Sequence, residues 1–155
     1  MAAFPGLRLV RNAALLPRRT WASLRRRFAS DYALERRSRA AVAGWFSPER
    51  LARLDAVPGM CGTHTCRVLA LLASEAPASG DIVEIGAWKG RITVWLVEAA
   101  ARRSDQPRVI SIDPHLRDSW DAFCRTVADF KLAERGLQVA RQRSHDAARG
   151  WSRPI

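Results

Sequence analysis

The sequence predicts an α/β fold: a parallel β-sheet with helices on both faces, preceded by a helical segment at the amino terminus. Three observations predict it. The chain has 155 residues, about the length of one domain. Short β-branched runs alternate with helical patterns from residue 81 onward, which is typical of parallel sheets. A turn containing glycine joins the first run to the helix that follows it, as expected where a buried strand ends near a ligand.

Three strands and two longer helices are expected in the carboxyl-terminal half. A helix over Arg91–Arg103 places two arginines in its last turn, where the helix dipole favours positive charge. A helix over Arg117–Glu134 carries large apolar side chains at spacings of three, four and three, and Gly136 ends it. Ser144 can cap a last short helix. The expected strands are Ile82–Ile85, Val109–Ile112 and Leu137–Ala140.

A helical lid segment is expected over residues 31–79, before the sheet. Ser30 or Asp31 can cap its first helix. Ser47, followed by proline, opens a second short helix, and Thr63 begins a third.

Residues 1–30 are expected to form a basic, flexible tail. The first 40 residues hold ten arginines and two acids, a net charge of +8, whereas residues 41–155 carry only +3. Mitochondrial transit peptides also alternate arginine with apolar residues, but serine is scarce here. We therefore expect a cytoplasmic protein with no nucleic-acid partner. No apolar run approaches the ~20 residues of a membrane-spanning helix, so no membrane span is expected.

The cysteines favour a reducing compartment over a disulfide framework. Cys61, Cys66 and Cys124 are odd in number and have no disulfide-framework spacing. Cys61, His64 and Cys66 do cluster, but no second ligand pair follows at zinc-finger spacing. No metal site is expected.

The segment most informative about function joins the first two strands. It reads Ile-Val-Glu-Ile-Gly-Ala-Trp-Lys-Gly over residues 82–90, and Asp113 follows the second strand. Glycines allow a ligand to approach the backbone closely, and the helix amino terminus offers free N–H groups beside it. An acid after the second strand can accept hydrogen bonds from a ribose diol. Together these features predict a nucleoside site.

The glycine spacing excludes two common phosphate-binding motifs. The dinucleotide motif requires Gly-x-Gly-x-x-Gly, but Trp88 and Arg91 stand where its second and third glycines would be. The phosphate loop requires four residues between its glycines, and only three separate Gly86 from Gly90. Glu84, an acid two residues before Gly86, instead suits a cofactor with a cationic amino acid end and no phosphate.

At these residues the sequence resembles the class I S-adenosylmethionine-dependent methyltransferases, over about residues 58–155. Residues 83–90 look like the branch with a large residue in place of the middle glycine, common among small-molecule and sugar O-methyltransferases. The resemblance implies S-adenosylmethionine as cofactor and a Rossmann-like sheet, of which residues 80–155 would form the amino-terminal half. Asp113 would hold the ribose hydroxyls, and Ser144 would lie near adenine. The residues around the methionine part would be Glu84, Gly86, Ala87, Trp88 and Gly90.

Each of these residues also has an ordinary structural interpretation. Glu84 could pair with Lys89 or Arg91. Asp113 could cap the next helix, and Trp88 could be a packing residue. Their joint occurrence at strand, turn, helix and strand spacing favours a cofactor site.

The resemblance also implies what lies beyond this sequence. The family's sheet has seven strands, and the fourth, which usually lines the acceptor or binds a metal, would begin near residue 151. The sequence therefore predicts a sheet that is incomplete at the carboxyl terminus, with the first strand as an open edge that can support homo-oligomerisation. No catalytic residue can be assigned. His115 is interpreted as a loop histidine, with an acceptor-side role as the alternative.

The predicted function is O-methylation of a small-molecule or sugar acceptor, with this chain as the cofactor-binding half of the enzyme. Two alternatives stay open. One is a truncated, inactive methyltransferase-like protein that binds the cofactor or a partner. The other is an RNA methyltransferase that uses the basic tail as an anchor.

Overall fold

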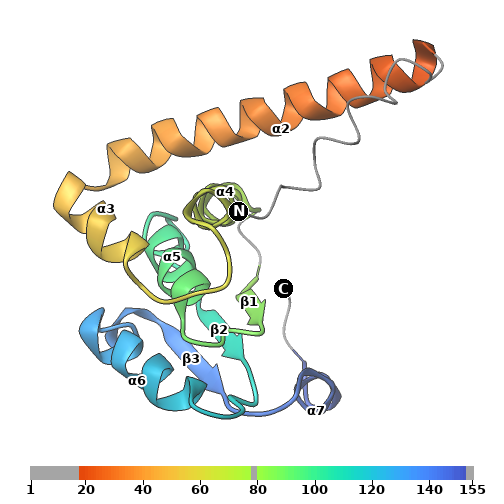
Figure 1. The fold of residues 1–155 in the computed structure, drawn as a ribbon. Helices are drawn as coiled ribbons and strands as arrows, with labels where there is room; N and C mark the ends of the chain where they lie inside the picture. The colour runs from red at the N-terminus through yellow and green to blue at the C-terminus, as the bar shows by residue number, and fades with distance from the viewer. Residues whose placement is uncertain (1–17, 78–79, 153–155) are drawn as a thin grey trace, which may run out of the picture. The chain divides into compact units, whose positions relative to one another are not determined.

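The computed structural model describes residues 18–77 and 80–152, and it confirms the predicted α/β fold (Figure 1). The chain divides into two compact units, residues 1–36 and 37–155. Helix α2 (Arg18–Trp45) begins in the first unit and ends in the second. The remaining helices, all in the second unit, are α3 (Pro48–Asp55), α4 (Thr63–Glu75), α5 (Arg91–Ala100), α6 (Ser119–Asp129), the 3-10 helix η3 (Ala133–Arg135) and α7 (Ser144–Arg149).

The three strands lie where the sequence predicts them and form one parallel sheet in the order β1, β2, β3. Ile82 is opposite Val109, and Val109 is opposite Leu137, so the strands are in step along their whole length. Their carboxyl ends therefore share one edge of the sheet, where the predicted site residues follow the strands. The strands are β1 (Ile82–Ile85), β2 (Val109–Ile112) and β3 (Leu137–Ala140).

Helices cover both faces of the sheet, as predicted. The larger core joins Val109 of β2 to Trp95 of α5 and Phe123 of α6. On the opposite face, Ile110 and Ile112 pack against Ala147 of α7. The alternation follows from the strand period of two residues, which directs neighbouring side chains to opposite faces. Because β2 lies between two other strands, all four of its residues are buried.

Strand β1 is an edge of the described sheet. Its last residue, Ile85, is 68% exposed, although Glu84 beside it is buried. An exposed apolar edge strand offers unpaired backbone groups to another chain. Homo-oligomerisation through this edge stays a prediction.

The amino-terminal helix begins earlier than the sequence analysis expects. Ser30 and Asp31, the predicted caps, lie inside α2, and Gly44 lies in its last turn. Residues 18–43 contain no proline or glycine and many good helix formers, arginine, alanine and leucine among them. This propensity carries the helix through the possible caps. More than half of the predicted tail, residues 1–17, lies outside the described residues.

The segment between α3 and α5 is anchored by Arg91, the first residue of α5. Its guanidinium donates hydrogen bonds to the backbone carbonyls of Val57 (2.5 Å) and Cys61 (2.8 Å). A Cβ at Gly59 would lie 2.4 Å from the Arg91 Cβ, so only glycine fits this close approach. The predicted cap of α3 is confirmed, because the Ser47 hydroxyl accepts a hydrogen bond from the Arg50 amide. These contacts fix the start of α5 beside the sheet edge.

Three predicted helix ends differ from the structure. Helix α5 ends at Ala100, three residues before its predicted end. Helix α6 ends at Asp129, because Lys131 takes a left-handed conformation (φ 52°) that breaks the helix before η3. Ser144 is the first residue of α7, and Arg143 occupies the cap position, so the prediction that Ser144 caps this helix is wrong.

Glu98 of α5 forms a buried ionic cluster on the core side of the sheet. Arg135 binds both carboxylate oxygens, at 2.8 and 2.9 Å, and Arg50 binds one of them. Arg102, four residues later in the chain, also pairs with Glu98, at 3.4 Å. Burial opposes ionisation, but the hydrogen bonds and charges of Arg135 and Arg50 outweigh it and lower the pKa of Glu98 to about 2.

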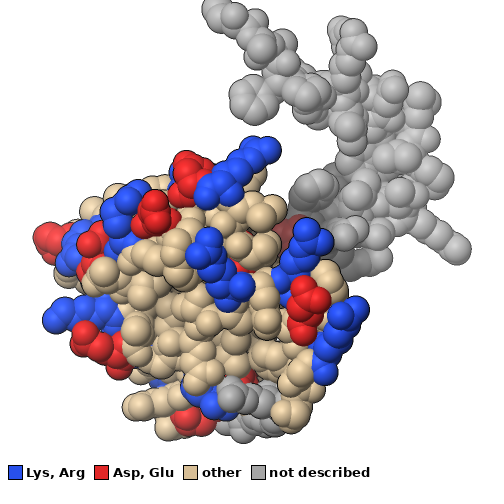
Figure 2. Space-filling view, turned by 90° about the horizontal axis from the view of Figure 1, so that it is seen from below, with Lys and Arg blue, Asp and Glu red and all other residues tan. Residues whose placement is uncertain are grey.

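The charges on the second unit are mixed in sign. On the face shown in Figure 2, basic and acidic side chains lie close to one another around an area of uncharged residues. This agrees with the small net charge of residues 41–155. Among the described residues, no helix is long and apolar enough to span a membrane.

Candidate functional site

The loop that follows β1 is shaped by two glycines with positive φ, Gly86 (88°) and Gly90 (91°). Gly90 is the cap of α5, and a Cβ there would lie 3.1 Å from the Thr126 Cγ2. A Cβ at Gly86 would meet nothing within 4 Å, so its glycine is required by the backbone and leaves open space beside it. The Thr126 hydroxyl donates a hydrogen bond to the Lys89 carbonyl (2.8 Å) and fixes the loop against α6.

Asp113, after β2, is brought to this loop as predicted. Its Oδ2 accepts a hydrogen bond from the Trp88 amide at 2.8 Å, and its Oδ1 accepts one from the His115 amide at 2.6 Å. A carboxylate has about four acceptor positions, so each oxygen retains capacity for a further donor. The side chain is 13% exposed, which leaves it reachable from solvent. Asp113 does not cap α6, because Asp118 occupies that position.

Trp88 is part of this loop. It has a left-handed backbone conformation (φ 49°) and is 37% exposed. The Lys89 ammonium lies 4.6 Å from the centre of its ring and 3.8 Å from the Asp118 carboxylate. Ala87, by contrast, is buried. Trp88 therefore packs against the protein over part of its side chain and faces solvent over the rest.

Glu84 is a buried carboxylate at the base of the site. Its Oε2 accepts a hydrogen bond from the Thr93 hydroxyl at 2.5 Å, and its Oε1 is buried without a hydrogen-bond partner. Burial raises the pKa of Glu84 to about 7, against the hydrogen bond from Thr93 and the effect of the Ser111 hydroxyl, and the Asp113 charge adds to the increase. The ion pairs considered from the sequence do not form: Arg91 binds backbone carbonyls, and Lys89 lies beside Asp118. A buried oxygen without a partner is costly, so a hydrogen bond from a bound ligand to Glu84 Oε1 would be favourable.

We expect Glu84→Gln to stabilise the ligand-free protein at high pH. The folded pKa is about 7 and the ordinary value for glutamate is 4.5, so burying the charged carboxylate costs stability progressively from pH 4.5 to 7 and fully above 7. The neutral amide removes this cost, a gain of up to about 3 kcal/mol. Urea denaturation at pH 8 and at pH 4 measures it. A variant less stable than the native protein at pH 8, or a gain that persists at pH 4, would contradict the assignment.

Of the remaining candidates, Ser144 is exposed and His115 is buried. Ser144 is exposed at the start of α7, on the loop after β3, and not on the two loops that hold the other site residues. His115 lies in the loop after β2, as interpreted from the sequence, but it is buried there, with an exposed fraction of 2%. His64 and His145 lie outside the site, and His145 is paired with Asp146 at 3.0 Å.

Two buried polar residues of the site escaped the sequence analysis. Thr93 binds Glu84, and Ser111 of β2 is fully buried opposite Glu84 in the sheet register. The signal for Thr93 was available, because it interrupts an otherwise apolar helix in its first turn. No such signal exists for Ser111, since a serine within a strand has no characteristic spacing. Among the described residues, no three His, Cys, Asp or Glu side chains are grouped so as to hold a metal ion.

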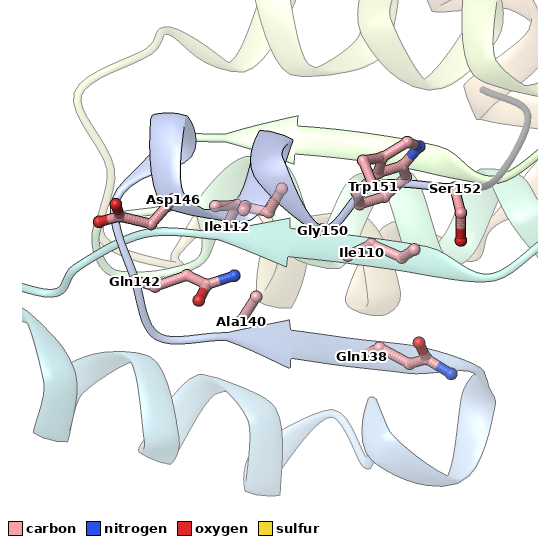
Figure 3. A pocket seen from close by; sticks show the side chains of 10 residues that line it. Ile110, Ile112, Gln138, Ala140, Gln142, Asp146, Gly150, Trp151 and Ser152 are labelled. Atoms are coloured by element: carbon pink, nitrogen blue, oxygen red, sulfur yellow. The ribbon is translucent and has the colours of Figure 1, made fainter.

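A groove of about 420 Å³ lies on the face of the sheet that α7 covers (Figure 3). Its lining side chains come from β2, β3, α7 and the residues after α7. None of the predicted cofactor-binding residues lines it. The glycine loop and its two carboxylates therefore form a site separate from this groove.

The residues of the site fall within a segment that matches a known protein family. Residues 83–155, which contain the glycine loop, Asp113 and Ser144, match the family model described as a methyltransferase domain. The match covers slightly less than half of the chain. The match confirms the methyltransferase resemblance, but it does not specify the O-methyltransferase branch.

Two solved structures are similar to parts of the chain. Cofactor-bound Rv0187 from MTB has 20% sequence identity and a TM-score of 0.49, over 73% of this chain and 48% of its own. A methyltransferase from Geobacter sulfurreducens has 26% identity and a TM-score of 0.43, over 70% of this chain and 52% of its own. The chain thus covers about half the length of each. None of the curated proteins matches it.

Proposed function

We propose that the methyltransferase domain binds S-adenosylmethionine where β1 and β2 end, and that it serves as the cofactor-binding part of an O-methyltransferase. The observation that carries the proposal is the pair of carboxylates beside the glycine loop. Glu84 has a buried oxygen without a partner, and Asp113 is held by two backbone amides. The family match supports methyl transfer as the reaction.

The residues of the site fit the parts of this cofactor. The open space at Gly86 lets a ligand approach the backbone. A cationic amino acid end would favour the charged form of Glu84 and so lower its raised pKa. The free acceptor positions of Asp113 suit the two ribose hydroxyls. Ser144, on the loop after β3, is proposed to lie toward the adenine.

Methyl transfer to oxygen needs little covalent chemistry from the protein. When bound, the cofactor would supply an electrophilic methyl group on a sulfonium: an acceptor oxygen would bond to the methyl carbon in line as the neutral thioether leaves, and the hydroxyl proton of the acceptor would pass to a base or to solvent. The residues at the glycine loop would contribute by fixing the donor's position, which lowers the barrier through orientation. Trp88, exposed above the loop, lies on the solvent side, where an acceptor would approach. A small molecule or sugar is the proposed acceptor.

Isothermal titration of the whole chain with S-adenosylmethionine tests the proposal, with NAD as the control ligand. NAD shares the adenosine part but has a pyrophosphate, which this glycine spacing does not accommodate. Binding of the methyl donor alone is the expected result.

A further inference from the structure

His115 is unusual among loop residues because its side chain is completely buried. The imidazole centre lies 4.4 Å from the Phe123 ring centre and 5.0 Å from that of Trp120, both on α6. Neither ring nitrogen has a hydrogen-bond partner. Buried polar atoms are ordinarily hydrogen-bonded. The position of this ring instead depends on its packing against the two aromatic rings of α6.

The backbone of His115 acts directly on Asp113. Its amide donates to Oδ1, and the Trp88 amide donates to Oδ2. Both donors are non-glycine residues at φ 49°, a conformation that is uncommon and persists only where the surroundings impose it. For His115 the surroundings are the two aromatic rings of α6. The packing of the imidazole therefore holds the amide that orients the carboxylate.

Two charged side chains, Asp113 and Arg141, act on the His115 ring. Asp113 lies nearest, with Oδ1 3.9 Å from Nδ1 of His115. Arg141, after β3, lies over the Trp120 ring at 4.5 Å, and the two α6 residues in contact with the imidazole are uncharged. Burial lowers the pKa of His115; the Asp113 charge and an interaction with the Trp88 backbone oppose this effect, and the Arg141 charge adds to it. The neutral ring is thus the form that fits the packed arrangement.

We propose that His115 is a positioning residue for Asp113: its neutral ring, packed against α6, fixes the amide that orients the ribose-binding carboxylate. Protonation places a cation in an aromatic site beside Asp113 Oδ1, where it competes with other donors for that oxygen. The consequence for cofactor binding rests on the proposed function. The coupling between His115 and Asp113 does not.

The coupling is tested without any ligand by an NMR titration of the imidazole signals. The chain has three histidines, so each can be assigned by single substitution. In Asp113→Asn, the pKa of His115 should fall below its value in the native protein, because the carboxylate that favours its charged form is gone. The signals of the other two histidines, which lie outside the site, serve as internal references for the titration. An unchanged pKa for His115 would overturn the proposal.

The consequence for the cofactor is tested by titrating S-adenosylmethionine into the whole chain between about pH 5 and pH 8. Glu84 also titrates in this range, so the native protein is compared with His115→Phe, in which Glu84 is unchanged. The affinity of His115→Phe should lie within about twofold of the native affinity at pH 8. As the pH falls, it should decrease less than the affinity of the native protein. His115→Asn, which tolerates the left-handed backbone but lacks the packed ring, should bind about tenfold more weakly.

Two results would contradict positioning: native affinity in His115→Asn, or identical pH profiles for the native protein and His115→Phe. A native protein that binds no S-adenosylmethionine at any pH would instead remove the proposed function. The histidine titration would then still decide whether His115 and Asp113 are coupled.

Discussion

Glu98→Gln should lower the free energy of unfolding by about 3 kcal/mol or more. The carboxylate is 4% exposed and is bound by Arg50, Arg102 and Arg135. Removing one partner from a buried ion pair typically costs about 3–5 kcal/mol, because the opposite charges stay behind without compensation. Each arginine is 26–29% exposed, which keeps the expected cost near the lower end. Urea denaturation at pH 7 measures it.

The pH dependence of this effect has a defined sign. Because the folded pKa is about 2 and the ordinary value for glutamate is 4.5, the ionised carboxylate contributes fully above pH 4.5 and its contribution is lost as the pH falls toward 2. The difference between native protein and variant should shrink over that window. Glu75→Gln is the matched control, because Glu75 forms an exposed ion pair with Arg37 at 2.7 Å. Such pairs contribute about 0–1 kcal/mol. Equal losses for the two variants would contradict the importance of burial.

Asp113→Ala should weaken S-adenosylmethionine binding by about 10- to 150-fold. The substitution removes charge-assisted hydrogen bonds of about 1.5–3 kcal/mol to the ribose hydroxyls. It also removes the acceptor of the Trp88 and His115 amides, which loosens the two loops that would surround the cofactor. For this second reason the loss should lie toward the upper end of the range. Isothermal titration at pH 8 provides the measurement.

Asp121→Ala serves as the control for this variant. Asp121 is an exposed carboxylate in the first turn of α6, near the site in sequence but with no role in it. Its removal should leave the affinity within about twofold, since an exposed helix-terminal charge contributes only a few tenths of a kcal/mol. If Asp113→Ala bound the cofactor as well as Asp121→Ala, the ribose assignment would have to be abandoned.

The strands could be predicted from the sequence because their signals are local. Each is a short run rich in apolar residues and limited by turn residues, and in β2 the three apolar residues Val109, Ile110 and Ile112 point to both faces, which indicates burial on both. The helix ends were less predictable. Residues 18–30 form helix by propensity despite the available caps, and α6 ends at a lysine in a left-handed conformation. Neither feature has a fixed sequence signal.

The site was predictable where it depends on chain topology. Glycines after β1 and an acid after β2 must meet at one edge of a parallel sheet, and the structure joins Trp88 to Asp113 there. What could not be predicted depends on packing between distant residues. The burial of His115 depends on the aromatic rings of α6, and the unpartnered oxygen of Glu84 depends on how α5 covers β1. Such contacts leave no regular spacing in the sequence.

The binding of S-adenosylmethionine to the whole chain, measured calorimetrically beside NAD, tests the central claim most directly. Circular dichroism first establishes that the chain is folded. The account predicts one binding site for the methyl donor, no binding of NAD, and loss of affinity in Asp113→Ala. A folded chain that binds neither ligand, or that prefers NAD, would contradict the assignment of the glycine loop and its carboxylates as a methyl-donor site.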